Sequence, residues 1–222
     1  SRLTLQGPIV KDKTSFIISG RRTYIGDLVQ AALKGSSFEG TNYYFYDLNA
    51  KINHKFSDKD RLFFSAYFGR DVLKFRQPKR DFYFDLPYGN STATLRWNHL
   101  FSNKLFFNLS AVYNDYKFEF NGGQADFNFR LFSGVKDWNL KLDFDYFAGT
   151  HHNVKYGFNY TYHTLTPNTA SATSGDVEFN TGFKPKYANE YAFYVMDDIK
   201  VSSDLAINAG VRYAIFSQVG PY

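Results

Sequence analysis

Short stretches in which one apolar residue alternates with one polar residue recur along this chain. The pattern is clearest over residues 43–56. The apolar positions there are Tyr44, Tyr46, Leu48, Ala50, Ile52 and Phe56, and the polar ones are Asp47, Asn49, Lys51, Asn53 and Lys55. Successive side chains of a β-strand point to opposite faces, so such a strand has one apolar face and one charged face. Half of a soluble sandwich would alternate in the same way. The repetition, length and aromatic content of these segments favour an outer-membrane β-barrel, with lipid outside and water inside.

We therefore predict an all-β fold, a transmembrane antiparallel β-barrel of which this chain supplies about ten strands. The predicted strands are 1–7, 14–25, 42–56, 61–71, 86–101, 105–119, 125–148, 154–165, 187–201 and 205–217. The connections alternate between short and long. The short ones are Pro8–Lys13, Ser57–Asp60, Ser102–Lys104, Gly149–Asn153 and Ser202–Asp204, and the long ones are 26–41, 72–85 and 166–186, with Asn121-Gly122-Gly123 as a short exception. Because outer-membrane barrels have short periplasmic turns and long extracellular loops, the alternation also predicts an orientation.

One predicted strand, 125–148, changes its alternation part of the way along. Apolar residues occupy odd positions at Phe127 and Phe129 but even positions from Trp138 onward. A hairpin turning at 133–137 would explain the change but would break the order of short and long connections. We favour one long strand with a β-bulge near Gly134, its upper half standing above the membrane.

The alternation assigns a lipid face and a lumen face to the predicted strands. The lipid face includes Leu62, Phe64, Ala66, Phe68, Ala93, Leu95, Trp97, Leu105, Phe107, Leu109, Ala111, Tyr113, Tyr156, Phe158, Tyr160, Tyr162, Leu205, Ile207, Ala209, Val211 and Tyr213. The lumen face includes Arg96, Asn98, Asn108, Asn114, Lys141, Asp143, Asp145, Lys155, Asn159, His163, Asn208 and Arg212. Charges at bilayer depth are costly, so these groups should face water or a plug. One of Arg21 and Arg22 must face outward, and we expect it at the upper interface.

Composition agrees with a barrel and excludes several other classes. Aromatic residues make up 20% of the chain, and Tyr and Trp suit membrane interfaces. The mean hydropathy of −0.41 is ordinary for a barrel, since half of each strand faces water. No apolar run approaches the roughly 18 residues of a membrane-spanning helix. The chain has no cysteine, and its net charge of +5 is scattered rather than clustered, so we expect no disulfide framework and no nucleic-acid binding.

Several polar residues are candidates for a catalytic, metal-binding or ligand-binding role. His151-His152 lacks the further ligands of a metal site, so both should be solvated turn residues. Asp143 and Asp145 share a face with Lys141 and suit acid–base work, cation binding, a lumen wall or a plug contact. Asp197 and Asp198 should point to opposite faces. His163 is expected near the extracellular rim, as a ligand contact or an ordinary polar residue. We assign no catalytic, cofactor or metal residue, and leave the ligand-binding residues open.

Two of the predicted loops carry further expectations. Residues 25–34 have apolar side chains at helical spacing, which predicts a short amphipathic helix packed on the rim, inside the lumen or against a partner lipoprotein. The loop 166–186 is rich in Thr, Ser, Asn and Gly and is expected to be exposed and mobile, closing over a substrate. Gly122-Gly123 is expected to form a tight turn.

Residues 5–24 resemble an early barrel hairpin of the TonB-dependent outer-membrane receptors of Bacteroidota. The matching residues are Gly7-Pro8-Ile9, Lys11-Asp12-Lys13, Ser15-Phe16, Ile18-Ser19 and Arg21-Arg22-Thr23-Tyr24, with further strand-like matches at 46–53, 191–200 and 210–213. The resemblance implies a barrel of about 22 strands, a plug, and energy from TonB through a box before the plug. It also implies, for some members, a SusD-like surface lipoprotein and a glycan or peptide cargo. No residue role is transferred by these motifs.

The sequence predicts an internal portion of such a barrel, because both ends fall beside strands and neither plug nor TonB box is present. The leading hypothesis is that the chain is part of an outer-membrane transporter, which imports a scarce, bulky nutrient such as a siderophore, glycan or peptide. Under this hypothesis we expect no enzymatic activity. One alternative is a self-contained ten-stranded outer-membrane protease or lipase, closed by pairing 1–7 with 205–217. Another is an adhesin-type barrel whose loops bind partners without transport.

Overall fold

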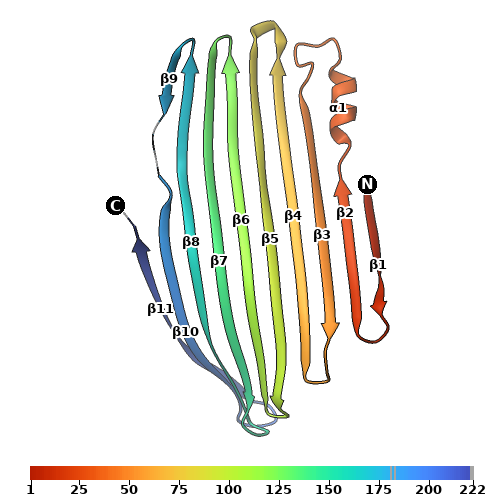
Figure 1. The fold of residues 1–222 in the computed structure, drawn as a ribbon, viewed down its shortest axis with the longest axis vertical. Helices are drawn as coiled ribbons and strands as arrows, with labels where there is room; N and C mark the ends of the chain where they lie inside the picture. The colour runs from red at the N-terminus through yellow and green to blue at the C-terminus, as the bar shows by residue number, and fades with distance from the viewer. Residues whose placement is uncertain (181, 183, 221–222) are drawn as a thin grey trace.

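A computed structural model describes residues 1–180, 182 and 184–220 of the chain. The strands form one antiparallel sheet in chain order, with β9 added to the side of β8 (Figure 1). The sheet is curved, and β1 and β11 form its two edges. The strands are β1 (Arg2–Val10), β2 (Thr14–Arg22), β3 (Asn42–Lys55), β4 (Asp60–Gln77), β5 (Phe82–Ser102), β6 (Leu105–Gln124), β7 (Phe127–Phe147), β8 (His152–Ser174), β9 (Val177–Asn180), β10 (Lys186–Lys200) and β11 (Ala206–Val219), and the helices are α1 (Ile25–Leu33) and a single 3-10 turn, η1 (Pro78–Arg80).

The turns at the lower end in Figure 1 confirm the five short connections expected from the sequence. Side chains close several of them. Ser57, for example, accepts hydrogen bonds at its Oγ from the backbone N–H groups of Lys59 and Asp60, both at 3.1 Å. The ammonium of Lys55 lies 2.5 Å from Asp58 Oδ1 and holds the pKa of that carboxyl below its usual range.

At the upper end the connection 26–41 is confirmed, but the predicted loops 72–85 and 166–186 are wrong in extent, because the strands continue through them. Residues 72–77 belong to β4 and 82–85 to β5, and the turn between them is only η1 and Asp81. The predicted loop 166–186 is mostly the upper end of β8 and the added strand β9; its residues 181 and 183 lie outside the described part of the chain. Ser, Thr and Gly favour loops locally, but pairing with a neighbouring strand satisfies the same backbone groups.

The glycine pair 122–123 also lies in a strand and not in the predicted turn. The turn falls at Ala125-Asp126, where Ala125 adopts a φ of +50°. A Cβ on Gly123 would lie 2.6 Å from Cε1 of Tyr83, so this glycine lets the tyrosine ring cross the strand. Close approach of a side chain, rather than reversal of the chain, accounts for Gly123.

The helix predicted over 25–34 is confirmed as α1. Gly26 is its buried residue, and a Cβ there would lie 1.7 Å from Asn42 Oδ1 and 2.4 Å from the Tyr43 carbonyl oxygen at the start of β3. The helix therefore packs on the rim of the sheet, as one of the expected arrangements had it. Ile25 and Leu28 remain 52% and 72% exposed.

The change of alternation in β7 has a different cause from the bulge that the sequence suggested. The ladder between β6 and β7 runs without a shift from Leu105↔Tyr146 to Gln124↔Phe127. A shift near Gly134 does occur, but on the β8 side, where Thr166 and Thr169 pair with Gly134 and Phe132. Residues of β7 therefore stay on the same two faces along the whole strand. Above Gly134 most of the apolar side chains lie on one face, and below it most of them lie on the other.

Register assigns every strand residue to one of two faces. We call the predicted lipid side the belt face: cross-strand neighbours place Ala66, Ala93, Tyr113, Trp138 and Tyr162 in one row across it. The opposite side, the polar face, carries Arg96, Ser110, Lys141 and Asn159 in one row. Arg21 lies on the polar face, 2.7 Å from Asp47, and Arg22 opposite Tyr46 on the belt face, so one of the two faces outward as expected.

The sheet is a single layer and has almost no core. Its buried apolar residues are Val72, Phe107, Ala188 and Ala192, and no large side chain among the described residues is fully buried. On the belt face Leu95 is 46% exposed, Phe193 51% and Val211 72%. No helix in the described ranges is long and apolar enough to cross a membrane.

The two edges of the sheet do not meet. Within the described residues, β1 pairs only with β2 and β11 only with β10. This confirms the prediction that residues 1–7 and 205–217 do not pair. It contradicts the ring closure required by the self-contained enzyme.

Candidate functional surface on the polar face

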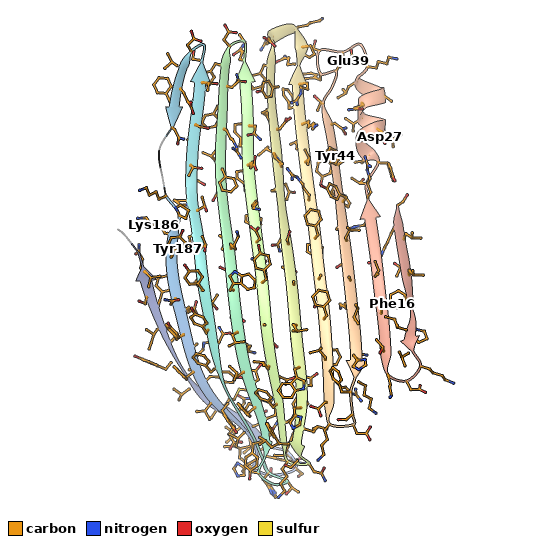
Figure 2. The ribbon with its side chains drawn as sticks, viewed as in Figure 1. Phe16, Asp27, Glu39, Tyr44, Lys186 and Tyr187 are labelled. Carbon is orange, nitrogen blue, oxygen red and sulfur yellow. The ribbon has the colours of Figure 1, made fainter. Side chains whose placement is uncertain are left out.

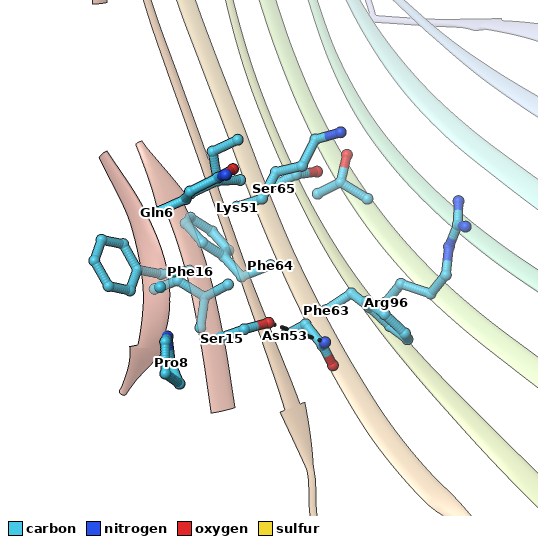
Figure 3. A pocket seen from close by; sticks show the side chains of 14 residues that line it. Gln6, Pro8, Ser15, Phe16, Lys51, Asn53, Phe63, Phe64, Ser65 and Arg96 are labelled. Carbon is cyan, nitrogen blue, oxygen red and sulfur yellow. Dashed lines mark hydrogen bonds between the residues drawn. The ribbon is translucent and has the colours of Figure 1, made fainter. Parts of the chain in front are cut away.

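A hollow of about 810 Å³ lies on the polar face across β1 to β5 (Figure 3). Two cations line it, Lys51 from β3 and Arg96 from β5, together with Ser15, Asn53, Ser65 and other uncharged residues. No acidic side chain lines it. Asn53 Nδ2 donates to Ser15 Oγ at 3.3 Å and Arg96 Nε donates to Ser110 Oγ at 3.2 Å. The hollow therefore suits a negatively charged group.

A network of charges occupies the lower part of the polar face. Lys141 Nζ lies 3.0 Å from Asp143 Oδ2, and the Tyr194 hydroxyl donates to Asp143 Oδ1. Asp145 stands opposite Lys155 in the register, and Lys155 pairs with Asp198 at 3.2 Å. Because Lys141 and Tyr194 both bind Asp143, this carboxylate is a structural tie between β7 and β10 in this structure. Asp143 is therefore not a free acid that could act together with Asp145.

His163 lies on the polar face, but its predicted position near the rim is wrong, because β8 continues upward to Ser174. Its Nδ1 is 2.8 Å from Asp137 Oδ1 on β7, and its Nε2 is 3.6 Å from Glu190 Oε2 on β10. The side chain is 18% exposed. Sequence reasoning missed both acids, which become neighbours only through the strand register.

Aromatic rings gather on the polar face at its upper end, where sequence reasoning had placed loops. Phe75 stacks on Phe84 with ring centroids 5.0 Å apart, Phe84 lies 5.7 Å from Phe120, and Phe120 6.0 Å from Phe129. Phe38, after α1, contacts Phe75 at 5.7 Å. Above the belt, therefore, this aromatic cluster lies on the polar face, while the charged Lys74 lies on the belt face. Figure 2 draws side chains along the full length of the strands, including these upper ends.

The remaining candidate residues contact neighbouring side chains and, within the described part of the chain, do not cluster into a binding site. His152 Nδ1 lies 2.7 Å from Asp197 Oδ2 on the belt face, and His151 contacts Thr150. Asp197 and Asp198 point to opposite faces, as predicted. In the ranges that the structure describes, no group of three His, Asp or Glu side chains is arranged to hold a metal ion.

Comparison with known proteins identifies one matching family and several solved structures with a similar fold. The family described as TonB dependent receptor-like, beta-barrel matches residues 23–221. BauA, the ferric preacinetobactin receptor from Acinetobacter baumannii, has a TM-score of 0.65 at 11% identity over 98% of this chain and 39% of its own. FpvA of P. aeruginosa, in its FpvA-Pvd(ATCC13535)-Fe complex, has a TM-score of 0.66 at 9% identity over 99% of this chain and 36% of its own. The chain thus spans less than two-fifths of either protein. No curated protein sequence matches it.

Proposed function

Because this chain belongs to the TonB dependent receptor-like, beta-barrel family, we propose that it forms an arc of the barrel wall of an outer-membrane transporter. One observation carries the proposal: apolar side chains such as Phe193 and Val211 stand uncovered along the belt face of a single-layer sheet. Uncovered apolar surface of this kind requires another apolar phase, and lipid provides it for a barrel. The charges of the polar face then point into the lumen, where water or a plug surrounds them.

The two open edges support a larger barrel. In lipid an unpaired strand edge leaves backbone N–H and C=O groups without partners, so β1 and β11 need neighbouring strands. We propose that the same protein supplies these strands and a plug, in a barrel of about 22 strands driven by TonB. Residues 1–222 are then one part of its barrel domain.

We place the short lower turns in the periplasm and the long upper strand ends outside the cell. Strands β4 to β8 extend well above the belt, and outer-membrane barrels carry their larger extensions on the extracellular side. The resemblance in residues 5–24 also predicts that the protein comes from Bacteroidota and that a SusD-like lipoprotein covers it, and both remain predictions. The exposed Ile25 and Leu28 of α1 are the surface where we would expect such a lid to contact this arc.

For the cargo we propose a bulky, negatively charged molecule that contains flat rings. Lys51 and Arg96 line the hollow without an acid beside them, and the Phe75–Phe84 stack lies above them on the same face. Of the two proteins with similar structures, one is a receptor of ferric preacinetobactin and the other is bound to a pyoverdine with iron. Ferric siderophores are therefore the first class to test, followed by acidic glycans and peptides.

Uptake measurements test the transport proposal. We expect cells that lack the full-length protein to lose uptake of at least one ⁵⁵Fe-labelled siderophore from a chemically diverse panel, and cells that lack TonB to lose the same uptake. Binding of cargo should persist without TonB, because the barrel and plug still form the site. Binding that never leads to TonB-dependent uptake of any compound would favour the adhesin alternative instead.

A further inference from the structure

The belt face becomes cationic where its apolar surface ends at the upper side. One register row holds Arg22, Tyr46, Arg70, Gly89 and Lys117. The row below it holds Asp115 opposite Lys136. We call Arg22, Arg70, Lys117 and Lys136 the upper border. These two rows contain four cations and one acid, so the border is positively charged.

Aromatic residues beneath the border indicate that it lies at the height of a membrane interface. Tyr113 and Trp138 stand in the next row down, with ring centroids 4.7 Å apart. Amphipathic rings of this kind are enriched where hydrocarbon meets headgroups. A cation one step above them lies at the height of the headgroups.

Arg70 is the cation of the border that is best placed to bind a ligand. It lines a hollow of about 120 Å³ together with Gly89, which stands between Arg70 and Lys117 in the register. The acids that also line the hollow already have partners: Asp115 pairs with Lys117 at 3.0 Å and Glu119 with Arg130 at 3.3 Å. Among the residues that the structure describes, no ion pair or hydrogen bond engages the Arg70 guanidinium.

The lower border of the same face is built differently. Asp60 accepts from Trp97 Nε1 at 3.1 Å and lies 2.6 Å from His99 Nδ1, and Asp197 pairs with His152 at 2.7 Å. Carboxylates paired with histidines thus stand here, where the upper border has arginines. The two borders thus offer different groups to the two membrane leaflets that the belt face would contact.

We propose that the upper border binds the phosphates of anionic lipids in the adjoining leaflet, with Arg70, at the hollow beside Gly89, as the seat of one phosphate. Guanidinium groups bind phosphate oxygens through paired N–H donors, and apolar surface directly below accepts the acyl chains. Because the cationic border adjoins the apolar belt surface directly, we expect its occupant to be a lipid and not free phosphate. The inference rests on the membrane insertion proposed above.

Lipid binding to the full-length protein in detergent tests this, measured by native mass spectrometry with three probes: a bis-phosphorylated lipid A, phosphatidylglycerol and phosphatidylcholine. We expect the double variant Arg22→Gln/Arg70→Gln to bind the two anionic lipids more weakly, by about fivefold for each cation removed. Phosphatidylcholine binding should not change. The matched control is Lys59→Gln/Lys104→Gln, which removes two cations from the lower turns.

The possible outcomes separate this inference from the transport proposal. Unchanged anionic lipid binding in the border variant, an equal loss in the turn control, or full displacement by millimolar inorganic phosphate would each overturn the lipid site. A protein that inserts and transports normally yet gives one of these results refutes the lipid site alone. A protein that does not fractionate with the outer membrane refutes the transport proposal itself.

Discussion

Gly157 lies between Asp143 and Tyr194 on the polar face, where a larger side chain would collide with its neighbours. A Cβ there would be 2.3 Å from the Leu142 carbonyl oxygen and 2.8 Å from Tyr194 Cε1. The glycine thus lets the tyrosine ring cross β8 and donate its hydroxyl proton to Asp143. At this scale, one missing side chain permits a tie between strands that are not adjacent in the sheet.

We predict that Gly157→Val destabilises the barrel by about 1–3 kcal/mol, because the ring and the backbone must both move. The midpoint of thermal or urea unfolding of the full-length protein, followed by the mobility shift of folded barrels on gels, measures the change. Gly149→Val in a lower turn is the matched control, since no atom lies within 4 Å of its Cβ position. Equal midpoints for the two variants would contradict this role of Gly157.

At the scale of elements, the first turn of α1 approaches the sheet closely at Gly26. Gly26 sits against Asn42 and Tyr43, while the Ile25 and Leu28 side chains remain exposed. An isolated helix of nine residues is marginal in water, so its contact with β3 determines whether it stays folded.

We therefore expect Gly26→Leu to release α1 from β3 without unfolding the strands. Trypsin should then cleave after Lys34 at least several times faster, because the connection opens by local unfolding. Ala31→Leu, an exposed change in the same helix, should leave the cleavage rate near the wild-type value. Cleavage that is equally slow in both variants would show that other contacts hold the helix.

At the scale of the whole molecule, the arc depends on partners that it does not itself contain. Its belt face is uncovered, and both edges are unpaired in the described residues. In the barrel that we propose, lipid and further strands supply what a second layer supplies in a soluble sandwich.

Cysteine cross-linking in the full-length protein tests this arrangement, since residues 1–222 contain no cysteine. We expect Leu5→Cys to form a disulfide with Ile18→Cys, its register neighbour on β2. It should form none with Val211→Cys on β11, because other strands lie between the two edges. A disulfide between positions 5 and 211 would show a closed barrel of this arc alone.

The sequence by itself determined the two-faced strands, the five lower turns and helix α1. Each depends on residues close together in the chain: a period of two, a tight turn, a helical spacing. Leu205, Ile207, Val211 and Tyr213, for example, needed only their own alternation to be placed on one face.

The tertiary structure alone decided the upper strand ends, the partners of the charged groups and the openness of the sheet. The sequence of 166–186 resembles a loop, yet its first half pairs with β7; His163 meets Asp137 and Glu190 from 26 and 27 residues away. The aromatic cluster was missed because the polarity of β7 inverts while its pleat continues. Alternation fixes which residues share a face within one strand, whereas register, which no local pattern encodes, fixes which strands bring them together.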